Sequence, residues 1–194
     1  MPRQPSKKST IEQAAMELFA SHGYAATTIK DIASKSGVTE GALYRHYVSK
    51  EEMASTLFER ELGSIVIRLL TSLDINKTPA QKLRSIIEKL YGMYKETPWP
   101  LLFVLLNFQN LKGDRILYQQ KNFYDLIIIY ANQLLGGLED ERLRELIPTV
   151  LNGVVVQPII YHYHNRLPRH PLEYLDEITE CCCKLMGLDN EDLA

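Results

Sequence analysis

The stretch of this 194-residue sequence that decides the fold is TTIKDIASKSGVTEGALYRHYVSKEEM, residues 27–53. Thr28 and Asp31 have the spacing of a capping box, in which two side chains satisfy free backbone N–H groups at a helix start. Gly37 predicts the end of that helix, because glycine accepts the left-handed conformation found there. Thr39 is a favoured N-cap for a further short helix. Two short helices joined by such a turn form the helix-turn-helix pattern.

Another predicted helix precedes this stretch, and a longer one begins at its end. Ser9 and Glu12 predict a capped start and Gly23 predicts a stop. Ser49 and Glu52 predict the start of a helix that continues toward residue 70. Because helices this short are marginal alone in water, the first three are expected to pack together as one helix-turn-helix domain, residues 1–50. Its predicted core consists of the side chains of Leu18, Phe19, Ile32, Val38, Leu43 and Tyr47.

Charge is unevenly distributed along the chain. Residues 1–50 contain 7 Lys and Arg against 4 Asp and Glu, a net charge of +3, whereas the remainder contains 15 against 20, a net charge of −5. A small basic domain joined to a larger acidic one predicts a polyanionic partner for the first domain only. The N-terminus lacks the apolar segment of a secretory signal, and the apolar run at residues 99–108 is shorter than the roughly 20 residues of a membrane span. A soluble, cytoplasmic protein without a membrane partner is therefore expected.

Residues 51–194 continue the helical spacing of apolar side chains, so the predicted fold class is all-α. Thr78 and Pro79 predict the start of one helix, and an apolar helix is predicted from Pro98. A further helix is predicted over residues 114–135. The three consecutive cysteines, residues 181–183, lie in a helical pattern and are predicted to be small core side chains. No metal site and no cofactor is expected.

The last two predicted helices carry more apolar surface than one small domain usually covers. Beyond Val150 the first of them is apolar on nearly every side, which calls for partner surface all around it. Two such helices from each of two chains would form a four-helix, two-fold interface. A wholly intramolecular core is the alternative. The residues predicted for the dimer interface are Leu151, Val154, Val155, Ile159, Leu175, Ile178, Cys182 and Leu185.

The short helix after Thr39 has the size and composition to enter the major groove of DNA, which admits one α-helix. Leu43 and Tyr47 lie one turn apart and are expected to face the domain core. Tyr44 then offers a hydroxyl to a phosphate, and Arg45 offers a guanidinium to a guanine or a phosphate.

Several outward residues also have simpler interpretations. Glu40 would favour the helix N-terminus through the helix dipole alone. Arg45 could be a solvated charge, and His46 could be a surface or packing side chain. Tyr47 is better explained as core than as a contact, although its hydroxyl could reach the edge of the DNA.

Residues 27–53 resemble the DNA-binding motif of the TetR family of transcriptional regulators. The matching positions are Gly23, Tyr24, Thr28, Ile32, Ala33, Gly37, Val38, Gly41, Leu43, Tyr44, Tyr47, Ser49, Lys50 and Glu51. The resemblance covers roughly residues 9–57, about a quarter of the chain. The sequence departs from the family pattern at Tyr47, where the family often has phenylalanine.

The resemblance implies a homodimer that binds a palindromic operator in double-stranded DNA, usually represses transcription and is released by a small molecule. It implies DNA contacts at Thr28, Thr39, Glu40, Gly41, Ala42, Tyr44, Arg45, His46, Tyr47 and Lys50. Residues 51–194 would then form a helical domain for effector binding and dimerisation.

Aromatic and amide side chains in the second domain are candidates for an effector pocket, since such pockets are mostly apolar with a few polar anchors. The candidates are Trp99, Phe103, Asn107, Phe108, Tyr118, Phe123, Tyr124, Asn152, Gln157 and His162. Few charges lie among them, which favours a mainly apolar or aromatic, neutral ligand. Each aromatic residue could equally belong to the core.

Two other functions compete with this interpretation. An enzyme with an accessory DNA-binding domain would need catalytic motifs, and the sequence contains no HExxH, GxSxG or phosphate-binding glycine loop. His162 and His164 do not project from one helical face, which disfavours a metal site. The chain is therefore predicted not to be an enzyme. A regulator that responds to a partner protein, or that has no effector, is the remaining alternative.

Overall fold

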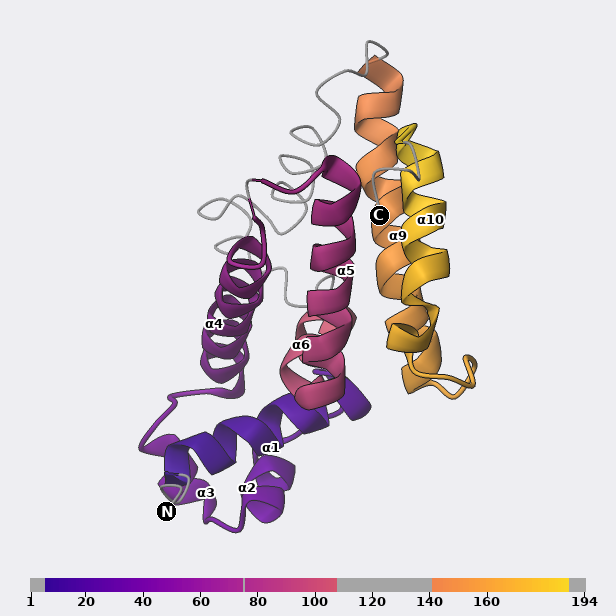
Figure 1. The fold of residues 1–194 in the computed structure, drawn as a ribbon. Coiled ribbons are helices and arrows are strands. Elements are labelled where there is room, and N and C mark those ends of the chain that lie inside the picture. The colour runs from indigo at the N-terminus through magenta and orange to yellow at the C-terminus, as the bar shows by residue number, and fades with distance from the viewer. Residues whose placement is uncertain (1–5, 75, 108–140, 189–194) are drawn as a thin grey trace, which may run out of the picture. The chain divides into compact units, whose positions relative to one another are not determined.

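The computed structural model describes residues 6–74, 76–107 and 141–188, and every regular element in these ranges is a helix. The all-α prediction is therefore confirmed. The helices are α1 (Lys7–Ser21), α2 (Ile29–Ser36), α3 (Glu40–Tyr44), α4 (Lys50–Leu70), α5 (Pro79–Glu96), α6 (Pro98–Asn107), α9 (Glu141–Tyr163), the 3-10 helix η1 (Pro171–Tyr174) and α10 (Leu175–Met186) (Figure 1). The helix predicted over residues 114–135 lies outside the described residues.

Helix α1 begins three residues earlier than the sequence predicts. Ser6 is the N-cap, and its hydroxyl accepts a hydrogen bond from the backbone N–H of Ser9 at 3.1 Å. The prediction of Ser9 as the cap with Glu12 as its partner is wrong, because the Glu12 side chain is buried against other helices. Its contacts are described below.

The helix starts predicted at Thr28, Ser49 and Thr78 are confirmed by capping hydrogen bonds. Thr28 and Asp31 form both halves of a capping box at the start of α2. Ser49 accepts the backbone N–H of Glu52 at 3.0 Å near the start of α4. Thr78 accepts the backbone N–H of Gln81 at 3.2 Å at the start of α5. These contacts span only three residues, which explains why the sequence alone predicts them.

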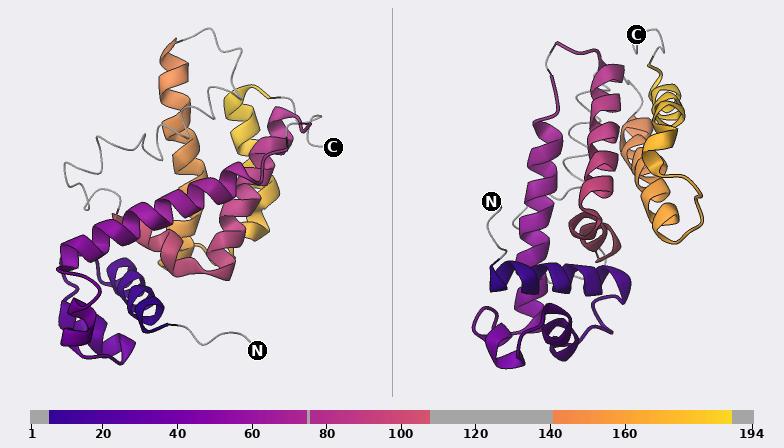
Figure 2. Two further views of the ribbon diagram at one scale, coloured as in Figure 1. Left: turned by 90° about the vertical axis from the view of Figure 1, so that its left-hand side faces the viewer. Right: turned by 60° about the horizontal axis from the view of Figure 1, so that its bottom comes forward.

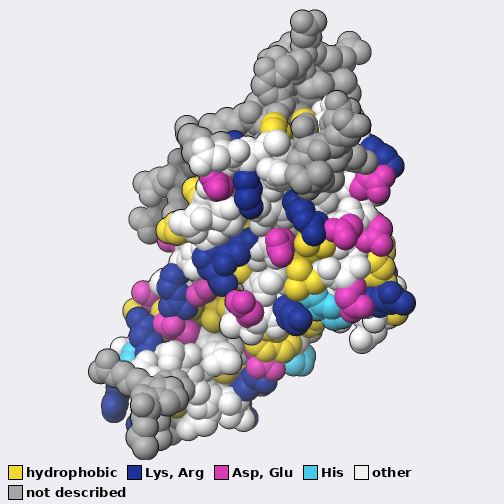
Figure 3. Space-filling view, viewed as in Figure 1, with side chains coloured by type: hydrophobic (Ala, Val, Ile, Leu, Met, Phe, Trp, Pro, Cys, Tyr) yellow, Lys and Arg dark blue, Asp and Glu magenta, His cyan; other side chains and the backbone are white. Residues whose placement is uncertain are grey.

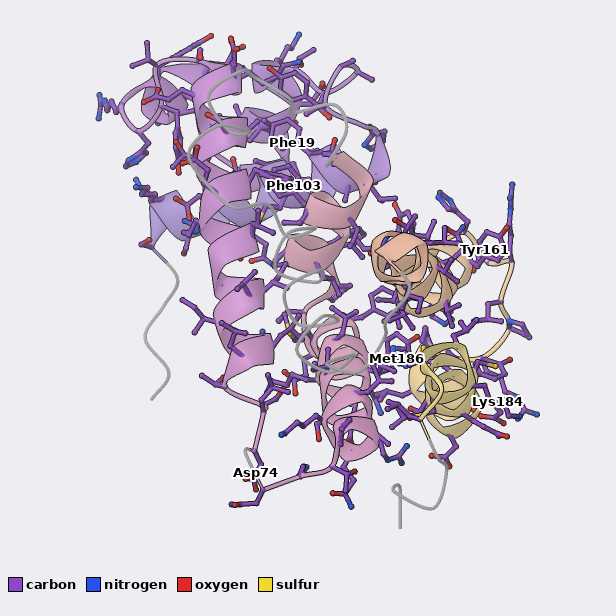
Figure 4. The ribbon with its side chains drawn as sticks, turned by 90° about the horizontal axis from the view of Figure 1, so that it is seen from above. Phe19, Asp74, Phe103, Tyr161, Lys184 and Met186 are labelled. Atoms are coloured by element: carbon purple, nitrogen blue, oxygen red, sulfur yellow. The ribbon has the colours of Figure 1, made fainter. Side chains whose placement is uncertain are left out.

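The first of two units combines α1, α2, α3, α6 and the part of α4 up to Ile65. Helix α1 lies across α4 in the views of Figure 2. The ring of Phe103 on α6 stacks on Phe19 at 5.6 Å between centroids and meets Phe58 of α4 edge-on at 6.1 Å. Figure 4 shows Phe19 and Phe103 next to each other in this core. The apolar core of the unit therefore joins three helices that are distant in sequence.

The second unit contains the end of α4 from Val66, together with α5, α9, η1 and α10. Helices α5, α9 and α10 lie side by side, and α9 and α10 run antiparallel (Figure 1). The Tyr91 hydroxyl of α5 donates to the carbonyl oxygen of Val155 on α9 at 2.9 Å. Met186 lies on the side of α10 that faces α5, and Lys184 lies on the opposite side (Figure 4).

The boundary between the two units falls inside α4, so this helix is continuous from one unit into the other. The functional division into residues 1–50 and 51–194 stays a prediction. Cys182 and Cys183 are buried on α10, as expected of small core residues, whereas Cys181 is exposed. Within the described ranges, no helix has the length and apolar character to cross a membrane.

Candidate nucleic-acid interface

The turn between α2 and α3 fixes how the two helices meet. Gly37 ends α2 with φ 68°, a left-handed conformation that side chains with a Cβ rarely adopt. Its backbone N–H donates to the Ser34 carbonyl, and the Val38 N–H donates to the Ala33 carbonyl at 3.0 Å. Thr39 then caps α3 by accepting the Ala42 N–H at 3.2 Å. The structure therefore contains the helix-turn-helix that the sequence predicts, and these hydrogen bonds define its turn and the start of α3.

Helix α3 is anchored to the core of the first unit by two side chains. Leu43 is 0% exposed and Tyr47 is 4% exposed, one helical turn apart in sequence. The Tyr47 hydroxyl donates to Glu12 Oε1 at 2.6 Å. Burial and this hydrogen bond raise the pKa of Tyr47, so its hydroxyl stays a donor at neutral pH. The hydroxyl is therefore engaged inside the protein, and its expected role as a DNA contact has no support in the geometry.

The other residues of this segment point outward as a group. The exposed side chains are those of Thr28, Thr39, Glu40, Gly41, Tyr44, Arg45 and His46, and Ala42 is half-buried. Tyr44 exposes 51% of its surface, a large fraction for an aromatic ring. Seven of the ten expected contacts are therefore exposed, one at the start of α2 and six on or beside α3.

Lys50 has a different environment from the other expected contacts. Its Nζ donates to the carbonyl oxygens of Tyr24 at 2.9 Å and Thr27 at 2.8 Å, and it lies 4.4 Å from the centre of the Tyr24 ring. An ammonium group has three protons, so one remains for a phosphate. Lys50 thus ties the turn between α1 and α2 to the start of α4, a role that no local sequence signal indicated.

Charged side chains of both signs lie on the surface of the protein, and individual basic side chains differ in whether they are paired. Basic and acidic side chains are interspersed over the face shown in Figure 3. Lys35 is paired with Glu17 at 2.9 Å. In the described part of the chain, neither Arg45 nor Lys30 forms an ion pair within 4 Å, so both charges are open to a polyanion. Val48 is 81% exposed directly after this segment. Val48 was not among the contacts predicted from the sequence, although its exposed apolar side chain lies close to α3.

The expected effector residues that the structure describes are divided between the two units. Phe103 is 0% exposed and packs in the first unit, where Asn107 also donates to the carbonyl oxygens of Phe19 at 3.1 Å and Phe103 at 3.0 Å. Trp99 is half-buried on α6. Phe108, Tyr118, Phe123 and Tyr124 lie outside the described residues. The saturated contacts of Phe103 and Asn107 assign these two residues to the core.

The other three candidates belong to the second unit. Asn152 is half-buried, and Gln157 is exposed. His162 accepts or donates a hydrogen bond with the Tyr94 hydroxyl at 2.8 Å, and its ring lies 5.3 Å from that of His170. Burial, followed by the neighbouring His162, lowers the pKa of His170. Within the described residues, no group of three or more His, Cys, Asp or Glu is arranged to hold a metal ion.

Burial divides the residues expected at the dimer interface. Leu151, Ile159, Leu175 and Cys182 are buried within the second unit, whereas Val154, Val155 and Ile178 are half-buried and Leu185 is exposed. The exposed side of α9 instead carries Leu146, Val150, Gly153, Gln157 and Tyr161. The face available to a partner is thus shifted around α9 from the predicted one.

Comparison with known proteins supports the interpretation of this surface. Residues 11–57 match the family model described as bacterial regulatory proteins, tetR family. The HTH-type transcriptional repressor KstR2 of Mycolicibacterium smegmatis is 36% identical over 86 residues, which cover 44% of this chain and 42% of that protein. The chain thus matches less than half the length of this curated relative.

Solved structures extend the likeness to the whole fold. A TetR-like transcriptional regulator from Rhodococcus sp. RHA1 has a TM-score of 0.73 at 21% identity, covering 95% of this chain and 97% of that one. The transcriptional regulator FadR from Bacillus subtilis, solved in complex with stearoyl-CoA, has a TM-score of 0.71 at 18% identity, covering 90% and 97%. At these identities the likeness shows a shared fold.

Proposed function

We propose that this chain, whose residues 11–57 match the model of the tetR family of bacterial regulatory proteins, regulates transcription by inserting α3 into the major groove of an operator. The observation that carries the proposal is the division of one short segment into two sides. Leu43 and Tyr47 are buried, whereas Thr39, Tyr44 and Arg45 are exposed together. A helix anchored in this way presents its outer side to base edges and phosphates.

Within that surface, we assign the contacts by chemistry. Arg45 is the base reader or phosphate clamp, since its guanidinium is exposed and suits bidentate binding. Tyr44 and Thr28 donate hydroxyl groups to phosphates, and Lys50 contributes the one proton of its ammonium that the protein leaves free. These phosphate contacts would set the register of α3 along the groove.

We further propose that the active form is a homodimer that binds a palindromic site. The exposed side of α9 carries Leu146 at 55%, Val150 at 36% and Tyr161 at 43%, and Leu185 on α10 is exposed at 45%. A shallow depression of about 360 Å³, lined by both helices, lies between Val150 and Leu185. A two-fold dimer brings the same patch of both copies together, so this exposed apolar face is our candidate for the interface. The two recognition helices would then meet half-sites one DNA turn apart, roughly 34–36 Å.

A small-molecule effector is the least constrained part of the proposal. We propose a mainly apolar or aromatic ligand that favours a dimer whose recognition helices no longer match the operator. Long-chain acyl compounds are the first class to test, because the similar FadR structure contains stearoyl-CoA. The proposed outcome of effector binding is release from DNA and relief of repression.

The DNA-binding proposal is tested by selecting duplexes from a random pool with the purified protein and measuring affinity for the selected site. Arg45→Ala should lower affinity for that site about 5- to 100-fold, in line with the loss of one good contact to a base. Tyr44→Phe should lower it about 2- to 10-fold, since it removes one hydrogen bond. Arg169→Ala removes an arginine that is also exposed but lies in the second unit, and it should leave the affinity for the selected site unchanged. Equal affinity of the Arg45 and Arg169 variants would refute the assignment.

The dimer is tested separately by light scattering of Leu185→Glu and Val150→Glu, which place a charge on the proposed face. Both variants should shift the mass from two chains toward one. Ile67→Glu is the matched control, because Ile67 is an exposed apolar residue, 62% accessible, on α4 and away from this face. Unchanged mass in both interface variants would rule out this face.

A further inference from the structure

A buried carboxylate joins three parts of the first unit. Glu12 lies on α1 and is 6% exposed. Its Oε1 accepts the Tyr47 hydroxyl at 2.6 Å, and its Oε2 accepts Arg60 Nη1 at 2.6 Å. Lys8 Nζ lies 3.9 Å from Oε1, one turn away on the same helix. Both oxygens of one side chain are thus occupied, one from the segment after α3 and one from the middle of α4.

Stability alone does not explain this arrangement. The Glu12 side chain is 9% exposed, so its carboxylate is largely removed from water, whereas the Arg60 side chain is 45% exposed. Burying the carboxylate costs free energy that an apolar side chain at position 12 would avoid. Apolar contacts, unlike hydrogen bonds, do not require a particular orientation of the two groups. A hydrogen bond at 2.6 Å requires a fixed distance and angle, and it weakens steeply when either is lost. The Glu12 contacts therefore specify a geometry between helices.

The two partners of Glu12 are placed where geometry matters for DNA binding. Tyr47 follows the last residue of α3 by three positions, and its ring is part of the anchor that holds α3. Arg60 lies on α4, the helix that continues from the first unit into the second. Its guanidinium is itself held, because Glu61 accepts Nε at 2.9 Å and Nη2 at 2.8 Å. A displacement of α4 therefore moves a restrained donor.

We propose that Glu12 is a positioning residue that transmits the placement of α4 to the recognition helix through Arg60 and Tyr47. This inference rests on the proposed DNA-binding function. With the linkage intact, α3 has one orientation relative to α4 and binds its preferred site. When α4 shifts by roughly the 0.5–1 Å that separates a strong hydrogen bond from a broken one, Glu12 moves with Arg60 and Tyr47 follows, or the linkage opens.

The test compares specific with non-specific DNA affinity in variants that open the linkage at either end. Tyr47→Phe removes the hydroxyl and keeps the ring, and Arg60→Met removes the guanidinium and keeps most of the apolar stem. Each should lower affinity for the selected site about 5- to 20-fold and leave affinity for an unrelated duplex within about 2-fold, because non-specific binding depends on charge and not on orientation. The double variant should lose no more than the larger single loss, since both changes act through Glu12.

Matched controls separate positioning from general destabilisation. Arg68→Met removes the same charge from the same helix but breaks only the exposed pair with Glu96. Tyr91→Phe removes a buried tyrosine hydroxyl from the second unit. Both should retain the ratio of specific to non-specific affinity. Arg60→Lys, which keeps the charge and one donor toward Glu12, should recover part of the loss and serves if Arg60→Met does not fold.

The results separate failure of the Glu12 linkage from failure of the proposed DNA-binding function. A wild-type protein that selects no sequence overturns the proposed function itself. A wild-type protein that selects a site, with Tyr47→Phe and Arg60→Met keeping its full affinity ratio, overturns only the linkage. Losses that add in the double variant also overturn it, because independent effects would not pass through one carboxylate.

Discussion

Replacing Phe103 with alanine measures whether this ring belongs to the core or to an effector pocket. Phe103 is 0% exposed, stacks on Phe19 and meets Phe58 edge-on. Truncation of a fully buried phenylalanine removes its transfer free energy and leaves a cavity, which together cost about 3–5 kcal/mol. For a chain of this size the melting temperature should fall by roughly 6–20 °C. Urea unfolding followed by circular dichroism, at a fixed protein concentration, provides the free energy of unfolding.

Two variants control for the size and place of the change. Phe103→Leu keeps most of the volume and should cost less than about 2 kcal/mol. Ile67→Ala, at an exposed site, should stay within about 0.5 kcal/mol of wild type. A loss below about 1.5 kcal/mol in Phe103→Ala would contradict the core assignment, because a residue that lines an open pocket leaves no new cavity.

Two further changes test local interactions. Thr28→Ala removes the α2 cap and should cost about 1 kcal/mol in urea unfolding. The Thr28 hydrogen bonds lower the pKa of Asp31, so NMR titration should show this pKa returning toward its ordinary value in the variant, and an unchanged pKa would contradict the capping role. His170 accepts the Leu172 N–H at 3.2 Å through Nδ1, and burial, followed by the neighbouring His162, lowers the pKa of His170 in the folded chain. Its contribution to stability is therefore complete above the unfolded pKa of about 6.5 and is lost as the pH falls through the folded pKa. Between pH 7.5 and 5 the melting temperature should fall less in His170→Asn than in wild type, and equal slopes would refute this.

The local part of the DNA-binding surface was predictable from the sequence. The Thr28–Asp31 box, the Gly37 turn and the Thr39 cap depend on contacts within about four residues, and all are present. The outward direction of Tyr44 and Arg45 follows from helical spacing once Leu43 is placed in the core. These features need no knowledge of distant partners.

The apolar faces of the second unit were less predictable. Residues beyond Val150 are apolar on most sides of α9, so the spacing cannot tell which side packs on α5. In the structure Leu151 and Ile159 are buried, and Val150 and Tyr161 face outward. Four of the eight expected dimer residues are therefore buried within the second unit, since neighbouring positions on a helix point about 100° apart.

An all-helical chain, a capped helix-turn-helix and an exposed face on α3 could be predicted from the sequence, because they depend on short-range hydrogen bonds and on the helical spacing of apolar residues. The roles of Glu12, Lys50 and Phe103 could not be, because they depend on how distant helices pack. Glu12 meets partners 35 and 48 residues away, and Lys50 reaches carbonyl groups 26 and 23 residues away. A polar side chain that leaves water must find such partners wherever the packed helices bring them, and the spacing of residues along the chain does not specify where that is.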